Sequence, residues 1–435
     1  MLDLIIKNGQ CYINGKLEVK DIAVKDGKIL KIGEILEKAK EVYDAKKQIV
    51  LPGCIDTQTH FREPGSTDTE DLHSGSRAAV AGGITAVFEM PNTNPPTSNV
   101  KEFQRKLDLA KNRMYCNYAF YFGATADNVN QLAELKDLEG CCGIKLFAGS
   151  STGNLLVAEE RDIDKVFQNS SKVVAVHSED EEILNKNKKL IKNGDVHSHP
   201  VWRSEECAMS STRRIVRIAE RYKKKAHVLH ITTKQEIDFL SQHKGNITFE
   251  ITPQHLTIYA PDCYEKLGTY AQMNPPIRDK SHYDRLWYAV KNNLNDTIGS
   301  DHAPHLRANK DKDYPNSPSG MPGVQTLMPV MLNHVNDGKL SLNQLMKLVC
   351  ENPIKIFGIK NKGFIKEGYD ADFTIVDMNK KIVIKNENIE SKCGWTPFNE
   401  VEFTGTPVAT IISGSIKMRE GKILGDPEGT PLKFS

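Results

Sequence analysis

Eight short apolar runs, separated by longer amphipathic segments, occupy the middle of the chain between residues 51 and 365. The runs are, in order, CIDTQTHF, GITAVFEM, NYAFYFGA, GIKLFA, KVVAVH, AHVLHI, ITFEIT and TIGSD. Short runs that alternate with helical segments such as SEECAMSSTRRIVRIAERYKKK are typical of parallel strands joined by helices. Because no glycine-rich phosphate-binding turn follows the first run, the pattern favours a (β/α)₈ barrel over a doubly wound sheet.

The two ends of the chain show a different pattern, in which apolar and polar residues alternate over short runs between glycine-containing turns. A period of two is typical of β-hairpins, and neither end is long enough to form a stable sheet alone. We therefore predict an α/β protein. A TIM-type barrel over residues 51–365 carries a small β-sandwich domain built from both termini, residues 1–50 and 366–435.

The charge balance and the cysteines exclude several classes of protein. Lys and Arg total 58 and Asp and Glu total 56, so no excess of charge indicates a nucleic-acid or membrane partner. No run approaches the roughly 20 apolar residues of a membrane-spanning helix, and we expect a cytoplasmic protein. The 9 cysteines form no CxxC pair, which argues against a disulfide framework and a cysteine zinc site.

Ionisable residues close five of the apolar runs: His60, Lys145, His177, His230 and Asp301. The carboxyl ends of all strands meet at one mouth of a barrel, so we expect these side chains to lie together and to form a metal site. A lone histidine is more often a packing or surface residue than a ligand. We place six others in that class: His73, His197, His199, His243, His282 and His334.

Lys145 and Asp301 each admit two interpretations. Lys145 either lays its stem along the barrel wall with its ammonium in solvent, or it is a neutral amine among metal ligands. A neutral amine can add carbon dioxide to form a carbamate, which supplies two ligand oxygens. Asp301 either caps a helix or turn, or is a terminal metal ligand that also accepts a proton from water.

Four local motifs carry a resemblance to a known family: HFREPG at 60–65, MPNTNPP at 90–96, MNPPIR at 273–278 and SDHAPH at 300–305. Together with the run-end residues they resemble the amidohydrolase superfamily, and within it the dihydroorotases. The resemblance extends over nearly the whole chain. It implies reversible hydrolysis of the cyclic amide of dihydroorotate to carbamoyl-aspartate, a step of de novo pyrimidine (UMP) biosynthesis.

The resemblance also implies roles for residues of this chain. One or two zinc ions would be held by His60, Lys145 as N6-carboxylysine, His177, His230 and Asp301, and Asp301 would move the proton. The substrate-binding positions that it implies are Arg62, Asn92, Asn274, His305, Pro322 and Gly323. The last two lie in a polar segment, 306–323, that is either a mobile loop over the mouth or a plain surface loop. An allantoinase or dihydropyrimidinase type of activity is the alternative, although those enzymes usually lack arginine at the position of Arg62.

Gln58 departs from the family pattern, which has HxH where this chain has Gln58-Thr59-His60. Alternate strand residues share a face, so Gln58 and His60 both point into the mouth, but an amide oxygen is a weaker zinc ligand than imidazole. Three interpretations follow: a single-zinc enzyme, a two-metal enzyme with one loosely held ion, or a non-catalytic relative that partners aspartate transcarbamoylase. The other ligand and substrate-binding residues are all present, which favours an active enzyme. A homodimer is the other assembly that we consider.

Overall fold

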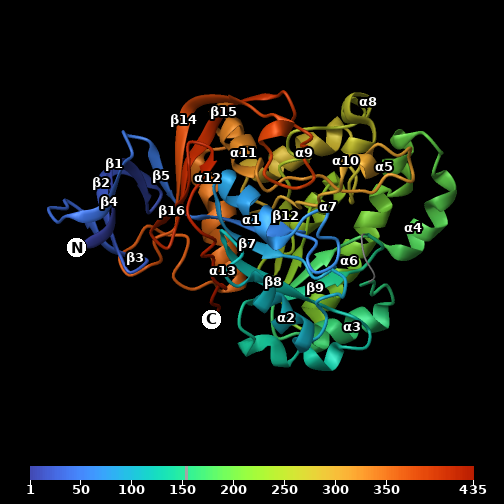
Figure 1. The fold of residues 1–435 in the computed structure, drawn as a ribbon. Helices are drawn as coiled ribbons and strands as arrows, with labels where there is room; N and C mark the ends of the chain where they lie inside the picture. Colours follow the sequence, from blue (N-terminus) through green and yellow to red (C-terminus); the bar gives the residue numbers. More distant parts are fainter. Residues whose placement is uncertain (152–154) are drawn as a thin grey trace.

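The computed structural model describes residues 1–151 and 155–435 and contains two sheets (Figure 1). The larger body is a parallel sheet of eight strands, in the order β13-β12-β11-β10-β9-β8-β7-β6. Its strands are β6 (Cys54–Thr59), β7 (Ile84–Glu89), β8 (Asn117–Gly123), β9 (Cys141–Phe147), β10 (Val174–His177), β11 (Ala226–Val228), β12 (Ile247–Ile251) and β13 (Thr297–Ile298). These match the eight predicted runs, so the predicted barrel is confirmed.

The first and last strands close the barrel through the residues around their carboxyl ends. The amide of Ser300 donates to Oδ1 of Asp56 at 2.9 Å, and the amide of His60 donates to the carbonyl of His302 at 2.8 Å. This closure places the segment after β13 directly beside the segment after β6. Residues about 240 positions apart in the chain therefore share one mouth.

Helices surround the barrel and cover it with their apolar faces. The α-helices are α1 (Leu72–Ala81), α2 (Val100–Ala110), α3 (Glu160–Asn169), α4 (Glu181–Asn187), α5 (His199–Trp202), α6 (Glu205–Arg221), α7 (Lys234–Leu240), α8 (Asp262–Leu267), α9 (Lys280–Lys291), α10 (Arg307–Lys310), α11 (Leu327–Asn336), α12 (Leu342–Met346) and α13 (Asn352–Phe357). The longest, α6, begins at Ser204, whose side chain accepts from the amide of Cys207. Ile215, Val216 and Ile218 of α6 are fully buried in the barrel core.

The second sheet has nine strands and forms the small β domain, drawn in dark blue and red in Figure 1. Its strands are β1 (Leu2–Ile13), β2 (Lys16–Lys25), β3 (Lys28–Gly33), β4 (Ala39–Asp44), β5 (Ile49–Pro52), β14 (Phe373–Val383), β15 (Glu402–Ile412), β16 (Ser415–Arg419) and β17 (Lys422–Ile423). The two chain ends join where β14 pairs antiparallel with β5, with Phe373 opposite Pro52. The prediction of one small β domain built from both termini is confirmed.

The last residues of the chain leave this domain and return to the barrel. Pro431 pairs with Tyr118 of β8, and Phe434 pairs with Ile359. The domain boundaries at residues 50 and 365 stay a prediction. The segment from Gly429 to the end packs on the barrel, where the amide of Gly429 donates to the carbonyl of Met114 and Leu432 is buried. Within the described residues, no helix is long and apolar enough to cross a membrane.

Candidate active site

One cavity at the carboxyl ends of the barrel strands brings the predicted residues together. Its described part measures about 20 Å³, room for roughly one water molecule. The residues that line it are Gln58, His60, Arg62, Asn92, Lys145, Phe147, Ser151, His177, His230, Asn274, Asp301, Ala303, Ser319 and Gly320. All five predicted metal ligands are among them, and each stands at or just after the end of a different strand.

His60, Gln58 and Asp301 form one half of the ligand set. Nδ1 of His60 lies 2.8 Å from Oδ1 of Asn92 and donates to it, because a carbonyl oxygen only accepts. Nε2 of His60 therefore carries a lone pair, and it faces Oδ1 of Asp301 at 3.2 Å. Nε2 of Gln58 donates to the same carboxylate oxygen at 2.9 Å, whereas the buried Oε1 of Gln58 has no hydrogen-bond partner.

His177 and His230 form the other half. Nε2 of His177 donates to Oε2 of Glu179 at 2.8 Å, which leaves Nδ1 of His177 with a lone pair 3.1 Å from Nε2 of His230. Nδ1 of His230 is buried without a hydrogen-bond partner. Glu179 in turn pairs with the buried Arg203. A carboxylate that orients a ligand histidine is a common support for a metal site.

These contacts fit a metal cation. Nε2 of His60 faces the Asp301 carboxylate although both atoms carry lone pairs. Nδ1 of His230 and Oε1 of Gln58 are buried and have no hydrogen-bond partner among the described residues. A cation held by imidazole and carboxylate groups satisfies such atoms, whereas without one they stay buried and unpaired. Burial keeps the pKa values of His60 and His230 well below the ordinary value, so both rings are neutral, as ligands must be.

Lys145 is almost completely buried in β9, and burial lowers its pKa to about 7 although Asp301 and Glu250 oppose the shift. A lysine with its stem on the wall and its ammonium in solvent would keep an ordinary pKa. A substantial neutral fraction near pH 7 is the state that can form a carbamate. The burial therefore favours the second interpretation of this lysine.

Backbone conformation marks three of the site residues. Arg62, His230 and Asp301 have φ values of 62°, 37° and 44°, in the left-handed region that side-chain-bearing residues rarely adopt. Each such residue stores roughly 1 kcal/mol or more of strain, which the surrounding fold must hold in place. All three side chains line the same cavity, so this backbone conformation orients them toward it.

Arg62 is 7% exposed and lines the cavity. Its Nε donates to the carbonyl of Pro304 at 3.3 Å, and its Nη2 lies 3.5 Å from Nε2 of His305. Burial lowers the pKa of Arg62 to about 10, so the group stays cationic near neutrality. Within the described residues it forms no ion pair with a carboxylate. A buried guanidinium without a counter-ion is a binding group for an anion.

The remaining substrate-binding predictions have mixed outcomes. Asn92 and Asn274 line the cavity, whereas His305 lies beside Arg62 and donates from its Nε2 to the carbonyl of Ser319 at 2.9 Å. Pro322 and Gly323 are not brought into this cavity and instead line a separate small one beside His302. Ser319 and Gly320 line the wall instead, because the next residue, Met321, pairs with His302 and the chain then turns away from this cavity toward the small one.

Sequence analysis missed two supporting residues. His199, placed among the packing histidines, contacts Oδ1 of Asn274 at 3.0 Å through its Nε2. Glu179 follows His177 by two positions, in HSED, and that spacing to a strand-end histidine was the available signal. Each of these residues contacts a residue of the site and does not itself line the cavity. Such a contact cannot be read from a single sequence.

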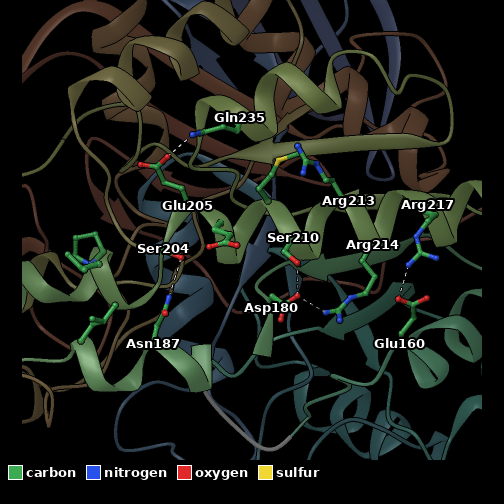
Figure 2. A pocket seen from close by; sticks show the side chains of 15 residues that line it. Glu160, Asp180, Asn187, Ser204, Glu205, Ser210, Arg213, Arg214, Arg217 and Gln235 are labelled. Carbon is green, nitrogen blue, oxygen red and sulfur yellow. Dashed lines mark hydrogen bonds and ion pairs between the residues drawn. The ribbon is translucent and has the colours of Figure 1, made fainter. Parts of the chain in front are cut away.

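Two other features near the barrel are not the active site. A cavity of about 1170 Å³ lies among α3, α4, α5, α6 and α7. Figure 2 shows the side chains that line it. Many of its polar groups already pair with one another, as Arg217 does with Glu160 at 2.7 Å. The possible ligand atoms of Glu205, Asp279 and His282 lie within 4.8 Å of one another. Nδ1 of His282 accepts from a backbone amide and Nε2 donates to Glu205, so we assign no metal there.

Comparison with known proteins agrees with this geometry. Residues 49–417 match the amidohydrolase family. Proteins named dihydroorotase from Methanosarcina acetivorans and Pyrococcus abyssi are 35% and 34% identical, over 98% and 97% of this chain and 94% and 96% of theirs. The solved structure of an L-hydantoinase (dihydropyrimidinase) from Arthrobacter aurescens superposes with a TM-score of 0.94 at 29% identity, covering 99% of both chains. The chain therefore belongs to the amidohydrolase family.

Proposed function

We propose that this amidohydrolase is a dihydroorotase, which hydrolyses the cyclic amide of dihydroorotate reversibly to carbamoyl-aspartate in pyrimidine synthesis. Its full-length relatives carry that name at 30–35% identity. The family and these relatives together support a hydrolase that acts on cyclic amides, with a small molecule as substrate. The choice among cyclic amides depends on one residue of the site.

Arg62 is the observation that carries this choice. Dihydroorotate bears a carboxylate beside its ring amide, whereas the simple hydantoin and dihydropyrimidine rings bear none. A buried guanidinium at the cavity wall with no protein carboxylate paired to it gains most from an anionic substrate. Asn92 and Asn274 supply amide groups on the same wall for the polar edges of the ring.

Zinc is the metal we propose, held by His60, Lys145 as a carbamate, His177, His230 and Asp301. When bound, it polarises the amide carbonyl and lowers the pKa of water at the site. The neutral histidines and the buried lysine supply the donor types that zinc prefers. Gln58 is the weakest metal ligand among these residues, because an amide oxygen binds zinc less strongly than imidazole does. Its amide nitrogen donates to Asp301.

Asp301 is the proton-transfer group in this proposal. Burial raises its pKa to about 6, although Lys145 and His177 oppose the shift, so the carboxylate can take and return a proton near neutrality. Gln58 and His60 both contact Oδ1 of Asp301. We assign the transfer to Oδ2, which takes the proton lost by the attacking water and returns it to the leaving ring nitrogen.

Two alternatives are tested by the same experiment. The solved structures with the same fold are hydantoinases, which makes a hydantoin or dihydropyrimidine ring the second candidate substrate. Gln58 makes a non-catalytic relative the third candidate. Turnover of dihydroorotate, hydantoin and dihydrouracil is measured on protein purified without chelator, together with zinc per chain.

The expected result is turnover of dihydroorotate that falls at least a hundredfold in Arg62→Met while zinc content stays unchanged, since a charge-assisted bidentate contact contributes about 3 kcal/mol. Arg113→Met, at a partly exposed arginine paired with Glu63, is the matched control. Equal use of dihydroorotate by Arg62→Met would disprove the substrate assignment. Absence of turnover after zinc and bicarbonate are added would instead identify a non-catalytic chain.

We also retain a homodimer and a complex with aspartate transcarbamoylase as hypotheses about assembly. Sedimentation of the protein alone, and mixed with aspartate transcarbamoylase, measures both assemblies. A boundary of this protein at the monomer position in both runs, unchanged by the added transcarbamoylase, would reject them.

A further inference from the structure

Lys310 is a fully buried lysine at the end of α10, with 0% of its surface exposed. It lies in segment 306–323, whose composition is consistent with either a mobile loop or a plain surface loop. Within the described residues it forms no ion pair with a carboxylate. A lysine in this position is unusual, because burying an ammonium without compensation is strongly unfavourable.

Three backbone carbonyls provide the compensation. Nζ of Lys310 donates to the carbonyls of Pro318, Gly320 and Gln272 at 2.8, 3.2 and 3.3 Å. An ammonium has three N–H donors, so the number of donors equals the number of acceptors. The ring of Trp395 lies 5.7 Å from Nζ and adds a cation–π contact.

Gln272 completes the same cluster from the opposite side. Its Nε2 donates to the carbonyl of Ser317 at 3.1 Å and to Oγ of Ser319 at 2.9 Å, and its Oε1 accepts from Oγ of Ser317 at 2.6 Å. The amide of Gly320 donates to the carbonyl of Gln272 at 2.9 Å. Lys310 and Gln272 thus bind every residue from 317 to 320 through main-chain or hydroxyl groups.

The residues that this cluster holds are part of the active-site wall. Ser319 and Gly320 line the cavity, and Asn274 stands two residues after Gln272. The carbonyl of Ser319 contacts Nε2 of His305, which stands behind Arg62. A shift of this backbone therefore moves the wall on the side where Arg62 and Asn274 meet the substrate.

We propose that Lys310 is a positioning residue for the substrate, whose ammonium group ties backbone 317–320 to Gln272 and so fixes the wall formed by Ser319 and Gly320. The inference rests on the proposed function, because the wall that it fixes is that of the dihydroorotate site. Lys310 does not line the cavity, so it acts through the backbone that it holds. Its loss is expected to weaken substrate binding and to leave the metal ligands intact.

The test compares Lys310→Met, which keeps the apolar stem and removes the ammonium, with Lys312→Met at an exposed position of the same segment. We expect KM for dihydroorotate to rise about tenfold in Lys310→Met with kcat within about threefold, as for loss of one charged hydrogen-bond cluster. Lys312→Met is expected to match the unmodified protein. An unchanged KM, or a fall in kcat alone, in folded Lys310→Met would overturn the proposal.

Hydrogen exchange of the peptide that contains Gly320 supplies a readout that does not depend on substrate. We expect its amides to exchange at least about tenfold faster in Lys310→Met than in Lys312→Met. If Lys310→Met does not fold, Ser317→Ala opens the same cluster from the side of Gln272 and is expected to raise KM and exchange in the same direction. Absence of dihydroorotate turnover by the unmodified protein would refute the proposed function, whereas unchanged exchange would refute the role of Lys310.

Discussion

The side-chain amide of Gln58 donates a hydrogen bond of 2.9 Å to Oδ1 of Asp301, the same oxygen that faces Nε2 of His60 at 3.2 Å. The amide nitrogen takes this orientation because an amide oxygen would meet another acceptor there. Gln58 therefore supports the carboxylate in this structure instead of adding a strong ligand. The departure from HxH changes the role of the position without removing it from the site.

Gln58→His is expected to increase the zinc content per chain. Imidazole nitrogen binds zinc more strongly than an amide oxygen, so the weak side of the mouth should move from about one ion toward about two. Elemental analysis of protein purified without chelator measures the change. Gln104→His, at an exposed position of α2, should leave the zinc content as it was. An equal zinc content in folded Gln58→His would contradict the ligand assignment.

Lys145→Ala should lose most of the bound zinc and all measurable turnover. Among the described residues that line the cavity, the substitution removes the only lysine and so the only source of a carbamate, while His177 and His230 remain. Zinc analysis and dihydroorotate hydrolysis are measured with and without added bicarbonate. Lys136→Ala, at an exposed position, is the control. Undiminished zinc in Lys145→Ala would exclude the carbamate.

Lys106 of α2 and Glu89 of β7 form a buried ion pair beneath the mouth, with side-chain exposures of 0% and 1%. Oε1 of Glu89 also accepts from the amide of Phe61, between His60 and Arg62. Lys106→Met should lower the free energy of unfolding by about 3 kcal/mol, because one charged partner is left buried alone.

Urea denaturation measures this effect, with Lys101→Met on the exposed face of the same helix as the control. Because removing both charges avoids the unpaired group, the double variant Lys106→Met with Glu89→Gln should recover part of the loss. A double variant no more stable than Lys106→Met would show that packing, not the unpaired charge, accounts for the loss.

The pH dependence of stability is expected to report on Lys310. Burial lowers its pKa from 10.5 to about 7 in the folded protein, so the ammonium that donates to three carbonyls is the folded form below about pH 7. Between about pH 7 and 10.5 the unfolded chain holds a proton that the folded chain has lost. The free energy of unfolding should then rise with pH by up to about 1.4 kcal/mol per pH unit across that window, relative to Lys310→Met. Denaturation of both proteins at pH 7 and pH 9 tests the sign. A difference that shrinks as pH rises would contradict it.

Strand periodicity was sufficient to predict the barrel. The eight runs became β6 to β13, and the ionisable residues at their ends met at one mouth because parallel strands all present their carboxyl ends to the same face. The alternation at both termini likewise predicted one small β domain built from both ends of the chain, which the structure forms as a nine-stranded sheet. These inferences depend only on local pattern and chain order, which a sequence states directly.

The structure of segment 306–323 could not be predicted from its composition. Its polar, Gly- and Pro-rich composition is equally consistent with a mobile loop and a surface loop, and only the fold placed Lys310 among three carbonyls and Ser319 in the wall. Three other contacts were likewise decided only by the fold: His199 with Asn274, Glu179 with His177, and Gln58 with Asp301.

Strand period and strand order were therefore enough to predict which ionisable side chains of the strand ends meet at the mouth of the barrel. They did not predict how those side chains are paired or which histidine nitrogen keeps its lone pair, because both depend on the folded chain. The reason is physical: hydrogen bonds and ion pairs act over about 3 Å, and residues such as Gln58 and Asp301 approach that distance only after the barrel has closed.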